Sequence, residues 1–233
     1  MKNNTKHLVI GFGQIGLAVR DILNANYIDI FPDRSDFEER NYEVLHICFP
    51  YKESFVETVR RYQNRFSPSI TIIHSTVPLG TSDKLSAVHS PCRGIHPNLK
   101  KGIMTFVKYF GGINAKEASK YFSDRGIKTY SYLSSRDTEA LKLWDTTSYG
   151  WNIILEKMIF KYCKENNLNF DLVYTDANKT YNDGYSQLGY PEYKKYILKH
   201  IEGKIGGHCV IDNLKHLDSK VASIIEDFNK KLN

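Results

Sequence analysis

The chain has 233 residues and a formal net charge of +6, with 41% hydrophobic and 25% charged residues. This composition is typical of a soluble globular protein and excludes a largely disordered chain. No apolar run approaches the roughly 20 residues of a membrane-spanning helix, and the polar start lacks a basic-then-apolar leader. We therefore expect a cytoplasmic protein with no membrane partner.

The positive charge is dispersed in short clusters, at residues 100–101 and 230–231 among others. A nucleic-acid site needs a denser basic stripe, so we expect no nucleic-acid partner. The cysteines form no CxxC pair and have no metal-ligand spacing, which predicts free thiols in a reducing compartment and no metal. They stand at Cys48, Cys92, Cys163 and Cys209, and all but the last are expected to be packing residues.

In the first part of the chain, short apolar runs alternate with helical patterns. This alternation predicts an α/β fold, a Rossmann-type doubly wound parallel sheet covered by helices on both faces. Strands are expected at residues 7–10, 27–31, 44–49, 70–74 and 129–133, with shorter β-like pieces around 93–95 and 109–111. Helices are expected at 15–23, over a stretch that Pro50 opens, and at 115–122.

From about residue 137 the pattern changes to one long helix that ends near Lys164. A stretch at 175–191 is rich in Asn, Asp, Gly and Tyr, which predicts a loop. A helix around 192–200, a loop at 203–207 and a terminal helix from about Ser219 are expected to complete the chain. We therefore divide it into a dinucleotide-binding domain, 1–134, and a smaller helical domain, 135–233.

A glycine-rich turn, GFGQIG, stands between the first expected strand and helix. Gly11 permits the tight turn, Gly13 lets the backbone approach a pyrophosphate, and Gly16 lets the helix pack on the strand. The helix that opens at Gln14 and Ile15 offers N–H groups and a positive dipole end to phosphates. The turn predicts a nicotinamide dinucleotide cofactor, and the alternative is a glycine turn without a ligand.

The residues after the second expected strand bear on the choice of cofactor. Asp33 lies roughly twenty residues beyond the first glycine, where an acid accepts a hydrogen bond from the ribose 2′-hydroxyl of NAD. Arg34 follows at once and would suit the 2′-phosphate of NADP. We expect NAD, because an aspartate repels that phosphate. Phe49, Pro50 and Ser75, at the ends of later strands, are expected to complete the cofactor site.

Several motifs follow one another along the chain. After the glycine turn come STVPLGT at 75–81, Ser90-Pro91, Gly111-Gly112, EALKL at 139–143 and GGHC at 206–209. In this order they resemble the nucleotide-sugar dehydrogenases, the UDP-glucose and UDP-mannosaminuronate dehydrogenase type of the 6-phosphogluconate dehydrogenase-like superfamily. The resemblance covers most of the chain and implies a truncated member that lacks the C-terminal UDP-binding domain.

The resemblance implies a dehydrogenase or reductase for a polar small molecule such as a sugar nucleotide. Thr76 would lie beside the nicotinamide, Lys142 would stabilise a developing oxyanion, and Cys209 would capture an aldehyde. The long helix would form a homodimer interface. Each residue also has an ordinary alternative: Thr76 caps a turn, Lys142 is a solvated helix residue, and Cys209 is a packed thiol. The substrate side is expected to include His96, Asn98, Thr146, Asn152 and His208.

The chain departs from the family pattern at three positions. Four residues after Cys209, Asn213 stands where the family has an aspartate, and Asp212 is one residue too early. Cys92 stands where the family has a glutamate, and Thr146 stands where it has an asparagine. These losses favour an alternative function, a catalytically degenerate dinucleotide-binding module that acts as a sensor or scaffold. The retained Lys142 and Cys209 favour an enzyme: a small oxidoreductase, or a sugar-nucleotide dehydrogenase whose missing domain a partner or another loop replaces.

Overall fold

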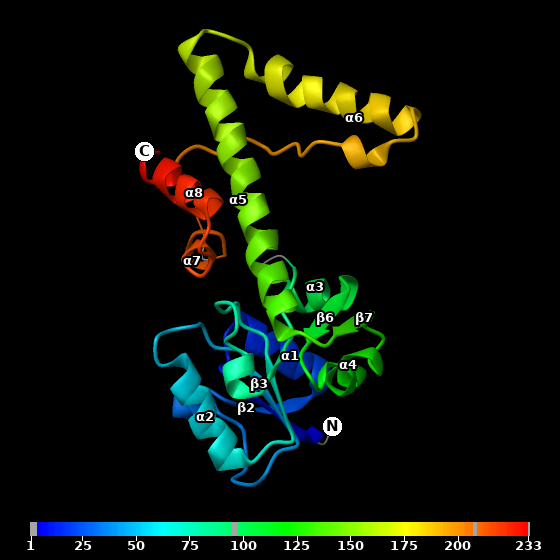
Figure 1. Cartoon of the computed structure of the whole chain (residues 1–233), viewed down its shortest axis with the longest axis vertical. Coiled ribbons are helices and arrows are strands. Elements are labelled where there is room, and N and C mark those ends of the chain that lie inside the picture. The colour runs from blue at the N-terminus through cyan, green and yellow to red at the C-terminus, as the bar shows by residue number, and fades with distance from the viewer. Residues whose placement is uncertain (1–3, 95–96, 207–208, 233) are drawn as a thin grey trace. The chain divides into compact units, whose positions relative to one another are not determined.

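The computed structural model describes residues 4–94, 97–206 and 209–232 (Figure 1). The chain forms two compact units, Met1–Lys142 and Leu143–Asn233. The boundary falls inside the long helix α5 (Ser135–Glu165), whose first two turns belong to the first unit. The sequence had assigned all of this helix to the second domain.

The described part of the first unit contains a seven-stranded sheet in the order β2-β1-β3-β4-β5-β6-β7. Its neighbouring strands are parallel, apart from the antiparallel pair β5 and β6. The expected Rossmann-type α/β fold is thereby confirmed. The strands are β1 (Asn4–Ile10), β2 (Ala25–Ile28), β3 (Val44–Ile47), β4 (Ile70–Ile73), β5 (Val88–His89), β6 (Lys108–Gly111) and β7 (Thr129–Tyr132).

Helices cover both faces of this sheet. Val9 and Ile72 belong to a core shared with α1, α3 and α4, whereas Leu8 and Ile73 belong to a core shared with α2. Central strands are buried on both sides, which is why they read as continuous apolar runs in the sequence. The helices are α1 (Gln14–Leu23), α2 (Phe55–Phe66), α3 (Leu99–Thr105) and α4 (Ala115–Ser123).

Two predictions for this unit were wrong. The strand expected at 93–95 is not formed by Arg93 and Gly94, and a short strand lies earlier, at β5. Gly94 has a φ of +147°, and a Cβ there would lie 3.0 Å from the Cα of Gly102 in α3, so this segment packs on a helix. The second strand ends at Ile28, earlier than expected. Residues 29–43 contain a 3-10 helix (Pro32–Arg34), and Asp36 forms an antiparallel bridge with Tyr27 of β2.

In the second unit the expected long helix is confirmed, but the expected loop at 175–191 is helical. It contains the end of a π-helix (Asp171–Asp176) and then α6 (Ala177–Gln187). Tyr181 and Tyr185, one helical turn apart, pack with ring centroids 4.7 Å apart, and the Thr180 hydroxyl donates to the Asp176 carbonyl. Such local contacts support a helix that composition alone does not predict.

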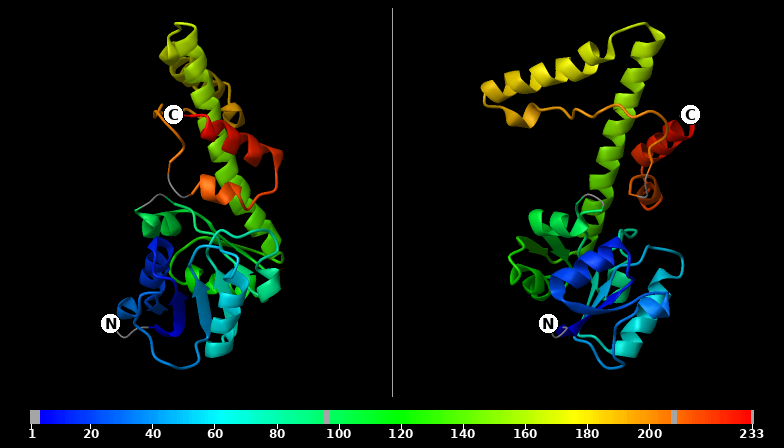
Figure 2. Two further views of the ribbon diagram at one scale, coloured as in Figure 1. Left: turned by 90° about the vertical axis from the view of Figure 1, so that its left-hand side faces the viewer. Right: turned by 180° about the vertical axis from the view of Figure 1, so that it is seen from behind.

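The prediction of a helix around 192–200 is also wrong, because a 3-10 helix (Pro191–Tyr193) is followed by non-helical chain. The Asn182 side chain accepts a hydrogen bond from Lys195 N–H and donates to the Lys195 carbonyl, which holds this segment against α6. We name residues 194–206 the return segment. In Figures 1 and 2 it runs back from the end of α6 toward α7 and α8.

The second unit has its own apolar core, formed by α5, the return segment, α7 (Ile211–Leu214) and α8 (Lys220–Lys230). The expected terminal helix is confirmed, and the Ser219 hydroxyl caps it by accepting from Ala222 N–H at 3.1 Å. Gly150 allows close packing here, because a Cβ would lie 2.7 Å from Val210 Cγ1. Across the described residues, no helix is both long and apolar enough to cross a membrane.

Candidate functional site

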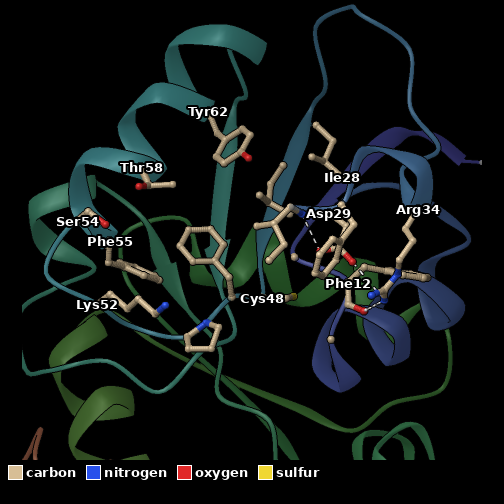
Figure 3. Close-up of a pocket in the computed structure, with 17 residues that line it drawn as sticks. Phe12, Ile28, Asp29, Arg34, Cys48, Lys52, Ser54, Phe55, Thr58 and Tyr62 are labelled. Atoms are coloured by element: carbon tan, nitrogen blue, oxygen red, sulfur yellow. Dashed lines mark hydrogen bonds and ion pairs between the residues drawn. The ribbon is translucent and has the colours of Figure 1, made fainter.

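A cavity of about 520 Å³ opens at the carboxyl ends of β1, β2 and β3 (Figure 3). The glycine turn lines one side of it, and α2 and the segment before α2 line the other. β1 lies between β2 and β3, so the cavity sits where the strand order reverses, the place where open α/β sheets bind ligands. Phe49 and Pro50 line it as expected.

The three glycines of the turn have different structural roles. Gly11 has a φ of +92°, and a Cβ there would lie 3.0 Å from Phe49 N. A Cβ on Gly16 would lie 1.9 Å from the Gly11 carbonyl oxygen, so Gly16 serves the packing of α1 on the turn. A Cβ on Gly13 would meet nothing within 4 Å. Gly13 therefore leaves open space at the edge of the cavity.

The turn also presents the N-terminus of α1. The N-cap residue, Gly13, has no side chain that could form a capping hydrogen bond, and the first turn of the helix carries no acidic residue. The N–H groups of a helix's first turn and its positive dipole end favour the binding of phosphate oxygens. Gln14 and Ile15 begin the helix and do not themselves line the described cavity.

The acid at the cavity is Asp29, which the sequence interpretation missed. Its carboxylate directly follows β2 and is nearly buried, with Oδ2 3.2 Å from Arg34 Nη2. Arg34 also donates to the Phe12 carbonyl at 3.2 Å, which ties the end of β2 to the glycine turn. Asp33, the acid that the spacing favoured, is exposed in the 3-10 helix and does not line the described cavity. The available signal was Asp29 itself, a charged residue inside the run 27–31 that was expected to be a strand.

Two of the family-like motifs hold each other in place within the first unit. The buried Glu139 carboxylate accepts from the backbone N–H groups of Gly80, at 2.5 Å, and Ser82, at 2.8 Å. Burial raises the pKa of the Glu139 carboxyl, and this effect is larger than the opposite effect of the hydrogen bonds, which lower the pKa. The Ser75 hydroxyl donates to the Phe49 carbonyl at 2.6 Å, which joins the loop to the end of β3. Thr76 is half-buried and does not line the described cavity.

His89 lies beneath this loop, at the end of β5, and Lys142 is close enough to influence it. The His89 ring contacts the Ser75 carbonyl at 3.2 Å and the Thr138 hydroxyl at 3.0 Å. Burial lowers the pKa of His89 to about 3, the Ser75 hydrogen bond opposes this, and the charges of Lys108 and Lys142 add to the lowering.

Three buried histidines on adjacent strands form a chain that the sequence did not predict. Nδ1 of His7 is 3.0 Å from Nε2 of His46, and Nδ1 of His46 is 3.0 Å from Nε2 of His74. Nδ1 of His74 is 3.0 Å from the Ser90 carbonyl. Because a carbonyl only accepts, His74 Nδ1 donates, and the three neutral rings must each donate from Nδ1. In the sequence each histidine stands singly in or beside an apolar run, so no local pattern marks the chain.

Lys108 anchors the Ser90-Pro91 motif from inside the core. Its buried ammonium donates to the Ser90 carbonyl at 3.1 Å and the Pro91 carbonyl at 3.3 Å, and it contacts Cys92 Sγ at 3.7 Å. Burial lowers the pKa of Lys108, while the nearby Cys92 raises it. Cys92, which replaces the glutamate of the family pattern, is therefore a buried partner of this lysine.

Cys209 is exposed, whereas the other three cysteines are buried, as expected of packing residues. It lines a cavity of about 490 Å³, and all the described residues that line this cavity belong to the second unit. Thr76 and Lys142 belong to the first unit, so the three expected catalytic residues are divided between the two units.

The expected substrate residues are also divided. Asn98 precedes α3 in the first unit, and its carbonyl accepts from Gly102 N–H. Thr146 is buried on α5 in the second unit, where the Asn152 amide donates to the Ser148 carbonyl at 2.8 Å. His96 and His208 lie outside the described residues. Within the described ranges, no group of three or more His, Cys, Asp or Glu residues is arranged to hold a metal ion.

No family model and no curated protein matches the sequence. Solved structures match the fold over nearly the whole chain. The UDP-D-ManNAc dehydrogenase of Pyrococcus horikoshii has a TM-score of 0.75 and 16% identity, and the match covers 97% of this chain and 68% of the dehydrogenase chain. The UDP-glucose dehydrogenase of Pyrobaculum islandicum has a TM-score of 0.71 and 11% identity, and the match covers 99% of this chain and 69% of the dehydrogenase chain. The 3-hydroxyisobutyrate dehydrogenase of Mycobacterium tuberculosis has a TM-score of 0.67 and 12% identity, and the match covers 97% of this chain and 93% of the dehydrogenase chain.

These likenesses confirm the resemblance to nucleotide-sugar dehydrogenases at the level of the fold. The chain has the fold of a dehydrogenase, a Rossmann-type unit followed by a helical unit, which sugar-nucleotide and hydroxyacid dehydrogenases share.

Proposed function

We propose that the protein is an NAD-dependent oxidoreductase that interconverts an alcohol and a carbonyl group of a polar small molecule. The observation that carries this proposal is the open space at Gly13, beside the N-terminus of α1 and the mouth of the 520 Å³ cavity. A turn that only packed strand against helix would need Gly11 and Gly16, but not a glycine with free space around it.

The residues around the cavity fit a dinucleotide. Gly13 and the N-terminus of α1 would hold the pyrophosphate, and the apolar side chains of Ile28 and Phe49 would contact the adenosine. Asp29 would accept from the ribose 2′-hydroxyl, which favours NAD over NADP. Arg34 would have to turn from Asp29 toward a 2′-phosphate for NADP to bind. The bound cofactor would supply the hydride acceptor or donor for the reaction.

The catalytic roles rest on Lys142, Thr76 and Cys209. Lys142 would bind the substrate oxygen and stabilise negative charge on it, because an ammonium favours an oxyanion over a neutral carbonyl. Thr76 would position a water or substrate hydroxyl from its half-buried place in STVPLGT. Cys209 would add to an aldehyde product as a nucleophile. We expect His96, Asn98, Thr146, Asn152 and His208 on the substrate side.

We also propose a homodimer that uses the second-unit part of α5. This helix exposes large apolar side chains that its own unit leaves uncovered. Such residues are enriched in protein interfaces. They are Trp144, Tyr149, Trp151, Leu155, Met158 and Tyr162.

The second candidate function is a dinucleotide-binding module without turnover. The environment of Cys92 favours it, because this thiol is buried against Lys108 and cannot replace the glutamate that the family pattern uses to activate water. A module of this kind would bind the cofactor through the same cavity. It would differ from the enzyme only in the absence of cofactor reduction.

The test is a calorimetric titration of the full chain with NAD⁺ and with NADP⁺, followed by a search for cofactor reduction with alcohols and sugar nucleotides. We expect NAD⁺ to bind more tightly, and a Lys142→Gln variant to bind it equally well but to lose turnover by about 100-fold or more. Lys161→Gln, an exposed lysine on the same helix, is the matched control. A folded protein that binds neither cofactor would overturn both candidate functions, and tight binding without any reduction would favour the module.

A further inference from the structure

Two thiols and an amine lie together inside the core that the sheet shares with α1, α3 and α4. Cys48 and Cys92 belong to this core, and the Lys108 ammonium lies over the rings of Phe110 and Phe122 in it, 5.6 and 5.2 Å from their centroids. Burial and Cys92 raise the pKa of Cys48, whereas Lys108 lowers it, so the three groups are near enough to affect one another's charge. A buried ammonium is costly unless it is paired and hydrogen-bonded. The cluster is therefore a feature that an apolar core does not need for its packing.

Within this cluster, Lys108 is held directly against Cys92. Its Nζ lies 3.7 Å from Cys92 Sγ, and it donates to the carbonyls of Ser90 and Pro91 at 3.1 and 3.3 Å. These carbonyls belong to the residues immediately before Cys92, so they fix the nitrogen beside the sulfur. Burial lowers the pKa of Lys108, and this effect exceeds the opposite effect of the two thiols. The lowered pKa favours the neutral amine, which is a nucleophile, over the ammonium, which is not.

Both thiols of the cluster are accessible to a small oxidant. Cys48 lines the cavity of the glycine turn (Figure 3). Cys48 and Cys92 each remain 6% exposed, whereas Cys163, in the second unit, is 1% exposed. Hydrogen peroxide is close to water in size, so a surface that water touches is open to it. The thiolate is the form that is oxidised, and a neighbouring lysine favours the thiolate. The contact between Cys92 and Lys108 thus joins an oxidisable sulfur to a nitrogen that can trap the oxidised product.

We propose that Cys92 and Lys108 form a redox-sensitive modification site, at which a peroxide oxidises the sulfur and the lysine nitrogen then bonds to it as a sulfenamide. The thiolate attacks one peroxide oxygen, the S–O bond forms and the O–O bond breaks. The departing hydroxide takes a proton from the Lys108 ammonium and becomes water. The neutral amine then attacks the sulfur, the N–S bond forms and the S–O bond breaks, and the second hydroxide leaves as water with a proton from the nitrogen. The sulfur loses two electrons, which reduce the peroxide to two molecules of water.

This site goes beyond the proposed dehydrogenase function, because it requires neither a dinucleotide nor Cys209. Its product is a covalent link between the segment that follows β5 and the first residue of β6. These two strands are joined by a single residue pair, His89 and Gly111. The link would replace the charged contact of Lys108 with a neutral bond, which thiol reduction reverses.

The test is a peptide map of the full chain after treatment with hydrogen peroxide. Free thiols are blocked with iodoacetamide in urea, and the chain is digested with trypsin. Residues 85–93, which contain Cys92, should be joined to residues 102–116, uncleaved after Lys108, because a bonded lysine is no longer a site for trypsin. The joined peptide should be lighter than the sum of its parts by two hydrogen atoms. Dithiothreitol before digestion should release both peptides and restore cleavage after Lys108.

Substitutions locate the bond. Lys108→Gln should abolish the link and leave Cys92 to be oxidised to sulfinic acid, which dithiothreitol does not reverse. Lys128→Gln, at an exposed lysine just before β7, is the matched control and should keep the link. Cys48→Ser should also keep it, which separates the sulfenamide from a disulfide of the same mass. In the native chain Cys92 should be consumed at least about tenfold faster than Cys163, because thiolate character and access control the rate.

The map of the native chain decides the matter even where a substituted chain fails to fold. A peptide that joins Cys92 to Cys48 would overturn the inference, as would oxidation of Cys92 with normal cleavage after Lys108. A joined peptide that is heavier by one oxygen atom would overturn the direct bond between sulfur and nitrogen. The assay contains no dinucleotide, so a failure of NAD⁺ binding leaves its result intact.

Discussion

Asp29 and Arg34 form an ion pair at the edge of the glycine-turn cavity, with 3.2 Å between Oδ2 and Nη2. Both side chains line the cavity, and Arg34 is also bonded to the Phe12 carbonyl of the turn (Figure 3). The pair brings together the acid that would bind the ribose of NAD and the base that would bind the 2′-phosphate of NADP.

Substitutions of this pair should therefore change the choice of cofactor. Asp29→Asn should weaken NAD⁺ binding about tenfold, because a hydrogen bond to a charged group is lost, and should strengthen NADP⁺ binding by removing a repulsive charge. Asp33→Asn is the matched control and should change neither affinity, since Asp33 lies outside the cavity lining. Calorimetry with both cofactors measures this. A larger effect on NAD⁺ affinity at Asp33 than at Asp29 would show that Asp33, the residue that the spacing favoured, binds the ribose 2′-hydroxyl.

Substitutions of two glycines of the turn should separate an effect on cofactor binding from an effect on the stability of the fold. Gly13→Val should leave the melting temperature nearly unchanged, because an added Cβ would meet nothing within 4 Å, but it should abolish cofactor binding. Gly16→Ala should instead cost at least about 3 kcal/mol of unfolding free energy, because its Cβ would overlap the Gly11 carbonyl. Thermal unfolding and calorimetry on both variants test the pair. Retained NAD⁺ affinity in Gly13→Val would remove the main support for the dinucleotide site.

The buried histidine chain should make the fold sensitive to acid. Burial lowers the pKa of His7 to about 4, and it lowers the pKa values of His46 and His74 well below the ordinary 6.5. Below pH 6.5 the unfolded chain takes up protons that the folded protein does not, so acid stabilises the unfolded state.

The free energy of unfolding should thus be highest above pH 6.5 and fall by roughly 2 kcal/mol per buried histidine between pH 6.5 and 5. Urea unfolding at pH 7 and pH 5 measures the difference. A His46→Gln variant should be less stable at pH 7 but should lose less stability on acidification. Equal stability of the native protein at both pH values would show that these imidazoles are not held neutral.

Glu139 should stabilise the STVPLGT loop rather than take part in chemistry. Its carboxylate accepts two backbone hydrogen bonds inside the fold, and an amide in Glu139→Gln would present an NH₂ group to one of those donors. We expect a loss of about 1–3 kcal/mol in the free energy of unfolding. Asp137→Asn, an exposed position on the same helix, should stay within about 0.5 kcal/mol of the native protein. Similar losses in both variants would contradict the structural role of Glu139.

Local patterns in the sequence were enough to predict the Rossmann-type sheet, the glycine turn and the long helix. A buried parallel strand must be apolar on both faces, and a turn with a positive φ at Gly11 favours glycine, so both leave direct marks in the sequence. Local patterns failed where polar residues form structure through specific pairs. Residues 177–187 were expected to be a loop because Asn, Asp and Gly are common there, yet side-chain contacts one helical turn apart support α6.

The sequence by itself determined which residues form the phosphate-binding turn, because the turn is built from consecutive residues whose backbone geometry selects them. Only the tertiary structure decided that Asp29 rather than Asp33 lies at the cavity, since this depends on where β2 ends. The chain of His7, His46 and His74 likewise exists only once three strands are adjacent. The contact between Cys92 and Lys108 also depends on folding, which brings the start of β6 beside the segment that follows β5.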